Sequence, residues 1–311
     1  MEGRTPVLIP KRLKKGDTIG VIAPASPPDL DNVKKAIPFF EKKGLHVRLG
    51  QHVANTYGHL AGTDEERLQD LHNFFKDPEI DGIICAGGGY GTARIADAID
   101  YDIIKNNPKI FWGYSDITFL HTSIRQQTGL VTFHGPMLGS DIGKDTFDDQ
   151  SRAMFDQLFS PETLVYDENF SPLSVISKGE ATGEIVGGNL SLLVTSIGTP
   201  FEIDTKGNLL LIEDIGEEPY RIDSFLNQLR QAGKFDDAAG IIVGDFSESD
   251  PKKEASLSLE EVLRFYFARL NKPVLSGFKI GHCLPHFAIP LGTKGSLSAS
   301  DKKLTIEPGV E

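Results

Sequence analysis

The strongest constraint on the fold of this 311-residue chain is the alternation of short apolar runs with helical patterns between residues 17 and 135. Continuous apolar runs of four to eight residues are typical of strands that are buried on both faces of a sheet. Strands that alternate with helices predict βαβ units and a parallel sheet. The predicted strands are 18–26, 46–50, 81–89, 109–113 and 130–135, and the predicted helices are 31–44, 63–77, 92–99 and 116–127.

The alternation stops after the fifth strand. Residues 136–179 lose the rhythm, and we predict a linker within about 137–178. Beyond it, strand patterns follow one another without regular crossover helices, which favours a mixed sheet. We therefore predict an N-terminal α/β domain over 1–165 and a β-rich α+β C-terminal domain over 179–311. The expected C-terminal strands are 180–189, 209–215, 238–246 and 303–310, with helices at 223–231 and 257–270.

Charge and cysteine content exclude several classes of protein. A net charge of -12 and a pI near 5.2 argue against a broad nucleic-acid-binding surface. The basic run Lys11 to Lys15 is short and reads as a solvated leader. Neither Cys85 nor Cys283 lies in a C-x-x-C pair or at metal-ligand spacing, and no metal site is expected. The opening residues contain no apolar segment suited to a signal peptide, and no run is long enough for a membrane span, so we expect a cytoplasmic protein.

Ser115 is the first candidate for chemistry. It follows the strand "KIFWG" and precedes a helix, which resembles the strand, turn and helix of a nucleophile elbow. Gly113 provides the small residue before the serine, but Ile117 stands where the second small residue would be. The alternative is a structural role, because serine is a favoured helix cap.

A serine nucleophile needs a base within hydrogen-bond reach and an acid that orients the base. His134 and His282 each follow an apolar strand, and their spacing does not choose between them. Glu213 and Asp214 end the buried run "NLLLIEDI". A carboxylate at such a strand end can be desolvated and suit the orienting role, although it can also be ordinary surface charge.

The glycine cluster "CAGGGYG" allows two interpretations. Its register does not match G-x-G-x-x-G, and no Lys-Ser or Lys-Thr follows, so a phosphate loop is disfavoured. Glycines can also bring backbone N–H groups close to an oxyanion. Cys85 lies inside the apolar run, where a buried inert thiol is the simpler interpretation than a nucleophile.

The order of these motifs resembles one family. "APAS", "GGYG", "GYSDIT" and "HGP" are followed by "GEIVGGNLSLL", "IEDIGEEPYRID" and a "GH" before "PLG". This combination, from about residue 16 to 307, is similar to the LD-carboxypeptidase A family of serine peptidases. The resemblance implies a flavodoxin-like N-terminal domain and a β-rich C-terminal domain, with the active site in the cleft between them. It also implies a homodimer that needs no metal or other cofactor.

The resemblance assigns roles residue by residue. The catalytic residues are implied to be Ser115, Glu213 and His282, and the oxyanion donors are implied to be the N–H groups of Gly88 or Gly89 and of Asp116. The implied substrate is a murein tetrapeptide, cleaved between meso-diaminopimelate and the terminal D-alanine during cell-wall recycling. Arg221 is a candidate for binding a substrate carboxylate, with a surface salt bridge as the alternative.

Two other functions stay open at this stage. Some relatives in the family cleave the peptidyl-nucleotide antibiotic microcin C and confer self-immunity. A ligand-binding module of periplasmic-binding or amidotransferase-like shape, without catalysis, is the third possibility. One departure from the family is visible: many relatives carry an arginine just before Gly-Gly-Tyr-Gly, where this chain has Gly87.

Overall fold

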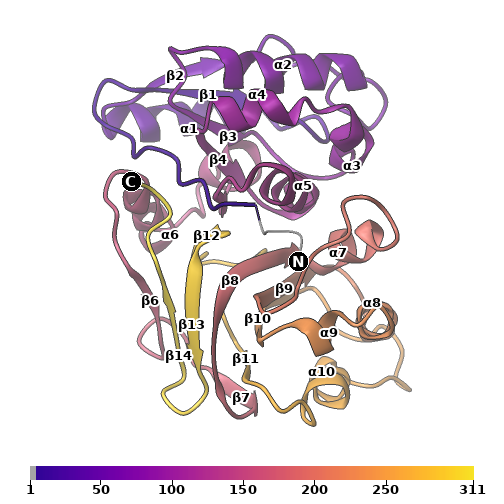
Figure 1. Ribbon diagram of the computed structural model, residues 1–311. Coiled ribbons are helices and arrows are strands. Elements are labelled where there is room, and N and C mark those ends of the chain that lie inside the picture. The colour runs from indigo at the N-terminus through magenta and orange to yellow at the C-terminus, as the bar shows by residue number, and fades with distance from the viewer. Residues whose placement is uncertain (1–4) are drawn as a thin grey trace. The chain divides into compact units, whose positions relative to one another are not determined.

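The computed structural model describes residues 5–311, which form two compact units (Figure 1). The N-terminal unit contains the described residues up to Glu162, together with Ala288–Gly292 and Pro308–Glu311. The C-terminal unit contains Thr163–Phe287 and Thr293–Glu307. The opening residues were predicted to lack a signal peptide. Residues 1–4 of this opening segment lie outside the described residues. Within 5–311, no helix is long and apolar enough to cross a membrane.

The sheet of the N-terminal unit has six strands in the order β12-β5-β4-β3-β1-β2. The first five strands in sequence are parallel and follow the order 2-1-3-4-5, which is the flavodoxin-like order that was predicted. β12 pairs antiparallel with β5 and was not predicted. It has only three residues, and its central proline argues against a strand except at the edge of a sheet. The strands are β1 (Thr18–Ile22), β2 (His46–Leu49), β3 (Gly82–Cys85), β4 (Ile110–Gly113), β5 (Thr132–His134) and β12 (Ile289–Leu291).

Helices of the N-terminal unit connect these strands. The sequence pattern Thr63-x-x-Glu66 is typical of a capping box, and this capping box is present at the start of α2. Trp112 of β4 stacks on Phe155 of η4 with ring centroids 4.3 Å apart, and Phe40 of α1 packs edge-on against the same ring. The helices and helical turns are α1 (Leu30–Lys42), α2 (Asp64–Lys76), α3 (Thr92–Ile95), η1 (Ala96–Ala98), α4 (Tyr101–Asn106), η2 (Ser115–Ile117), α5 (Thr118–Thr128), η3 (Leu138–Ile142), α6 (Asp149–Ala153) and η4 (Met154–Leu158).

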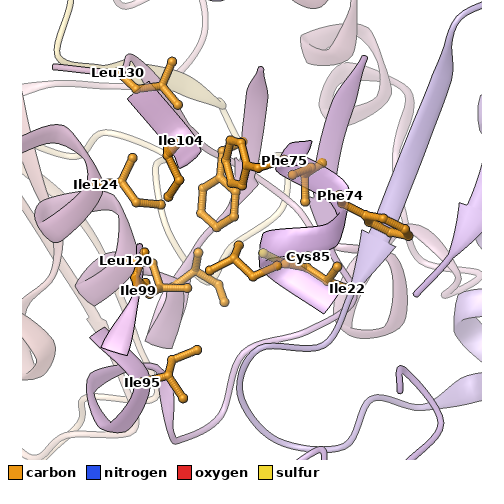
Figure 2. Close-up of a cluster of buried hydrophobic side chains, with 14 of the residues drawn as sticks. Ile22, Phe74, Phe75, Cys85, Ile95, Ile99, Ile104, Leu120, Ile124 and Leu130 are labelled. Carbon is orange, nitrogen blue, oxygen red and sulfur yellow. The ribbon is translucent and has the colours of Figure 1, made fainter. Parts of the chain in front are cut away.

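A buried apolar cluster joins the sheet to α2, α4 and α5 (Figure 2). Leu71, Phe74 and Phe75 come from one side of α2, as the 3.6-residue period predicts. Cys85 lies in this cluster and is fully buried, and burial raises the pKa of its thiol. The prediction of an inert core cysteine is therefore confirmed. This cluster supports the strand ends that carry the serine and the glycines.

The sheet of the C-terminal unit has eight strands in the order β6-β14-β13-β8-β9-β10-β11-β7. Its four middle strands, β8 to β11, are parallel, and the outer strands pair antiparallel. The predicted β-rich mixed sheet is confirmed. The strands are β6 (Leu164–Tyr166), β7 (Ser174–Ser177), β8 (Glu180–Asn189), β9 (Leu209–Ile215), β10 (Gly240–Ser247), β11 (Val274–Ser276), β13 (Lys294–Ser298) and β14 (Lys303–Ile306).

Four helices accompany this sheet, α7 (Leu190–Ser196), α8 (Pro219–Gln231), α9 (Lys234–Asp237) and α10 (Leu259–Phe267). Their apolar residues form a second core with alternate side chains of β8 to β11. The segment 137–178, where we expected a linker, contains η3, α6, η4, β6 and β7. Strands of three and four residues at sheet edges are too short to show a period, which is why the sequence did not reveal β6 and β7.

Candidate active site

Ser115 lies on a strained turn at the carboxyl end of β4. Its φ angle is +65°, a left-handed conformation that costs a residue with a Cβ about 1–2 kcal/mol. Neither η2 nor α5 is capped by a side chain, so the structure does not support the interpretation of Ser115 as a helix cap. A Cβ on Gly113 would lie 3.1 Å from Cys85 Cβ and from Ile117 Cγ1, so a larger residue there would force these neighbours to shift. Strain of this kind is typical of an exposed nucleophile on an elbow.

The glycine turn after β3 lies directly against this serine. A Cβ on Gly88 would be 3.0 Å from Ser115 Cβ and 3.2 Å from Ser115 Oγ. Gly89 has a φ of +105°, and a Cβ there would lie 2.5 Å from Ser26 Oγ. Within residues 5–311, the N–H groups of Gly88 and Gly89 have no hydrogen-bond partner. Gly88 thus lies against the serine, and both Gly88 and the next residue have N–H groups available to donate.

In the C-terminal unit, Glu213 and His282 form a buried pair. His282 Nδ1 is 2.8 Å from Glu213 Oε2, and the Glu213 side chain is wholly buried, while that of His282 is 12% exposed. Gly281 has a φ of +128°, and a Cβ there would lie 2.6 Å from Glu213 Oε2. On β10, a Cβ on Gly244 would lie 3.1 Å from Glu213 Cβ. Two glycines therefore give the carboxylate the space it occupies beside the imidazole.

Asp214, the next carboxylate, has a different environment. Its oxygens accept hydrogen bonds from the Asn189 side chain and from the backbone N–H groups of Ser191 and Ile215, so it anchors the start of α7. Burial and then the neighbouring charge of Glu213 raise the pKa of Asp214 to about 6. Side chains of adjacent strand residues point to opposite faces, which separates the two carboxylates.

Family models match both halves of the sequence. The LD-carboxypeptidase N-terminal domain matches residues 19–135, and the LD-carboxypeptidase C-terminal domain matches residues 182–297. The chain belongs to the LD-carboxypeptidase family. This finding confirms the family that the motifs suggested.

Relatives in this family match nearly the whole length of the chain. It is 56% identical over 302 residues to the probable murein peptide carboxypeptidase of Bacillus subtilis (strain 168), spanning 97% of this chain and 95% of that protein. A solved structure of MccF in complex with glutamyl sulfamoyl guanosine has a TM-score of 0.88 at 27% identity, covering 96% of this chain and 98% of that one. The muramoyltetrapeptide carboxypeptidase of Oxalobacter formigenes has a TM-score of 0.83 at 27% identity, covering 93% and 97%.

Two other histidines, both in the N-terminal unit, have core environments. His134, the rival base, is fully buried at the end of β5, with its ring 5.6 Å from that of Tyr114. His121 is also buried, and its Nε2 lies 2.8 Å from the carbonyl oxygen of Gly113. Burial lowers the pKa of His121 to about 4. Of the two candidates that the spacing left open, His282 has its ring Nδ1 hydrogen-bonded to a carboxylate.

Arg221 lies in the first turn of α8. Its guanidinium is about half exposed, pairs with Glu217 at 3.3 Å, and stacks over the Phe225 ring at 4.9 Å. This ion pair is the surface salt bridge expected under the alternative interpretation of Arg221. Binding of a substrate carboxylate by Arg221 stays a prediction.

Among residues 5–311, no group of three or more His, Cys, Asp or Glu side chains is arranged to hold a metal ion.

The resemblance implied a role for the backbone N–H of Asp116, but the sequence did not indicate a role for two charged side chains that are buried beside the glycine turn. Arg67 of α2 is 1% exposed, and the side chain of Asp116 is buried directly after the serine. A signal for Arg67 existed, because it lies four and seven residues before Leu71 and Phe74 and thus on the apolar side of the predicted helix. A charged residue in that stripe indicates a buried polar contact.

Proposed function

We propose that this chain is a serine LD-carboxypeptidase that hydrolyses the bond between meso-diaminopimelate and the terminal D-alanine of a murein tetrapeptide. The observation that carries the proposal is the 2.8 Å contact between His282 Nδ1 and the buried Glu213 carboxylate. The names of the Bacillus subtilis and Oxalobacter formigenes relatives support the substrate class. Further parts of the proposal are a cytoplasmic homodimer acting in peptidoglycan recycling and a reaction without metal.

The geometry suggests how the proton moves. Because the Glu213 carboxylate accepts the Nδ1–H of His282, the lone pair of the neutral imidazole lies on Nε2. In the proposed reaction, Nε2 takes the proton of Ser115 Oγ as the oxygen attacks the diaminopimelate carbonyl. Glu213 then stabilises the imidazolium that forms. The proposal requires His282 Nε2 to reach Ser115 Oγ in the working enzyme.

The remaining steps use the glycine turn. The N–H groups of Gly88 or Gly89 and of Asp116 would hold the oxyanion of the tetrahedral intermediate. Collapse of this intermediate breaks the C–N bond, and His282 donates its proton to the leaving D-alanine amine. Water, activated by the same imidazole, then hydrolyses the acyl-serine. Arg221 is the proposed partner of the substrate's free carboxylate.

A second candidate function follows from the structural comparison. The MccF structure, bound to glutamyl sulfamoyl guanosine, aligns with a TM-score of 0.88. A peptidyl-nucleotide is therefore the alternative substrate, cleaved by the same residues. The two candidates differ in the group that follows the scissile bond, an amino acid or a nucleotide derivative.

Mass spectrometry of a digest tests the proposal. Wild-type protein is incubated with L-Ala-γ-D-Glu-meso-diaminopimelate-D-Ala, in parallel with Ser115→Ala and with a chelator. We expect loss of one alanine, abolished by Ser115→Ala and unchanged by the chelator. A parallel incubation with an aminoacyl sulfamoyl nucleoside tests the alternative. If folded wild-type protein cleaves neither compound, the chain is better explained as a binding module without catalysis.

A further inference from the structure

The peptide group between Gly91 and Thr92, at the end of the glycine turn, is held at both ends by buried charged side chains. Arg67 Nη1 donates to the Gly91 carbonyl oxygen at 2.9 Å, and the Thr92 N–H donates to Asp116 Oδ2 at 2.9 Å. Arg67 is 1% exposed and Asp116 is 3% exposed. Hydrogen bonds to ionised groups are stronger than neutral ones, so this peptide plane has a single well-defined orientation.

Asp116 joins the glycine turn to the turn that carries the nucleophile. It directly follows Ser115, and its own carbonyl oxygen accepts a second hydrogen bond from Thr92 Oγ1 at 2.6 Å. Burial raises the pKa of this carboxyl, whereas hydrogen bonds from Thr92 and Gly91 and the charge of Arg67 oppose that rise. The two turns follow the neighbouring strands β3 and β4, and Asp116 fixes the separation between them.

Arg67 joins the same turn to the loop after β1. Its Nη1 also donates to the Pro24 carbonyl oxygen at 2.5 Å. Two residues later, Ser26 N–H donates to the Gly88 carbonyl oxygen, and Tyr90 N–H donates to Ser26 Oγ, both at 3.1 Å. These contacts occupy backbone groups around Gly88 and Gly89, whose own N–H groups have no partner within residues 5–311.

We propose that Arg67 and the Asp116 carboxylate are positioning residues that fix the glycine turn so that its free N–H groups face the oxyanion formed at Ser115. The inference rests on the proposed function, because it needs an oxyanion to form. Gly91 shows how closely the parts fit: its φ is +127°, and a Cβ would lie 2.6 Å from Leu60 Cδ2 and 2.9 Å from Arg67 Nη1.

Stability alone is a weak explanation for these charges. Buried ionic groups can often be replaced by apolar residues of similar volume without loss of stability, because removing charges from water is unfavourable. Oriented dipoles beside developing charge, in contrast, contribute to catalysis only if they are already in place. The location of both charges on one peptide group beside Ser115 fits the second role.

Two variants test the inference, with a matched control. Asp116→Asn removes the charge that binds Thr92 N–H, and Arg67→Lys keeps a charge but cannot span the same acceptors. The control is Arg94→Lys. The Arg94 side chain binds Asp64 at 3.1 and 2.9 Å, as Arg67 also does at 2.5 Å. Only the backbone N–H of Arg94 donates to the Gly91 carbonyl oxygen, at 3.2 Å, and the substitution leaves that group in place. We expect kcat to fall on the order of 10- to 100-fold in both test variants, with KM within about threefold. The control should stay within about twofold of wild type.

A second readout separates positioning from folding. A boronic-acid analogue of the peptide, which forms a tetrahedral adduct with a serine, should lose affinity by the same factor as kcat. Binding of intact tetrapeptide to Ser115→Ala protein carrying the same second change should stay within about threefold. Thermal midpoints and circular dichroism establish that each variant is folded, and Arg67→Lys supplies the test if Asp116→Asn does not fold.

The outcomes distinguish this inference from the proposed function. Wild-type kcat in both folded test variants, or an equal loss in Arg94→Lys, would overturn the positioning role while leaving a Ser115-dependent carboxypeptidase intact. A fall in kcat that matches only the folded fraction would also overturn it. If Ser115→Ala cleaves as fast as wild type, the serine mechanism itself fails, and the positioning role fails with it.

Discussion

The two units hold their reactive groups by different means. In the N-terminal unit, Ser115 is positioned by the backbone, through its own left-handed φ angle and through a glycine that leaves little room for a Cβ beside the serine side chain. In the C-terminal unit, His282 is positioned by a side chain, through a hydrogen bond to a carboxylate with no exposed surface. A group held by the backbone is sensitive to added volume, whereas a group held by a hydrogen bond to a carboxylate is sensitive to loss of that charge. The comparison predicts which kind of substitution damages each unit.

The largest effect is expected from removing the charge in the C-terminal unit. Glu213→Gln should lower kcat on the order of 10³- to 10⁴-fold, because an amide neither stabilises the imidazolium nor fixes the tautomer of His282. Steady-state kinetics on the tetrapeptide provide the measurement. Glu218→Gln, a carboxylate at the start of α8, serves as the control and should stay within about twofold. A loss below tenfold in Glu213→Gln would contradict the proposed triad.

Added volume in the N-terminal unit should have the next largest effect. In Gly88→Ala, the added methyl carbon would lie 3.0 Å from Ser115 Cβ. The glycine turn must therefore move, and kcat should fall on the order of 10²-fold. Gly87→Ala is a close control, because a Cβ there meets only Pro28 Cβ at 3.8 Å. If the two variants have equal activity, close packing of the turn against the serine is not required for the reaction.

Lowering the pH should destabilise the N-terminal unit through protonation of His121. Burial lowers its pKa in the folded state to about 4, below the ordinary value of 6.5, so the unfolded chain binds the proton more readily. The contribution of His121 to stability is complete above pH 6.5 and is lost as the pH falls toward 4, by about 3 kcal/mol. Denaturant unfolding followed by the fluorescence of Trp112, the only tryptophan, reports on this unit. His121→Gln should flatten the profile between these pH values, and identical slopes would refute the assignment.

The opposite pH dependence is expected in the C-terminal unit. Burial and the charge of Glu213 raise the folded-state pKa of Asp214 to about 6, above its ordinary value of 3.8. The associated stability is complete below pH 3.8 and is lost as the pH rises through 6, again by about 3 kcal/mol. Hydrogen exchange of amides in β9 and β10, corrected for intrinsic rates, should show weaker protection at pH 7 than at pH 5. Asp214→Asn should reduce that difference, and an unchanged difference would show that another group causes it.

The parts of the fold that follow local rules were predictable. The parallel strands of the N-terminal unit and the capping box of α2 depend on short-range patterns, and both are present. β12 was missed because its three residues become a strand only by pairing with β5, whose sequence is more than 150 residues earlier. The strands β6 and β7 were missed for a similar reason, since each is stabilised by a partner distant in sequence.

The candidate active site also has some features that depend on local sequence and others that depend on contacts between distant segments. From the sequence alone it follows that a serine stands between a buried strand and a helix, that glycines follow the preceding strand, and that two adjacent carboxylates end a buried strand. These are local properties of the chain. The partners of the two carboxylates depend on tertiary packing: Glu213 contacts His282, whereas Asp214 anchors α7. The alternation of a strand places the two side chains on opposite faces, but the elements packed on each face determine their partners. Likewise, the hydrogen bonds of Arg67 and Asp116 to one peptide group join three segments that meet only when the chain is folded.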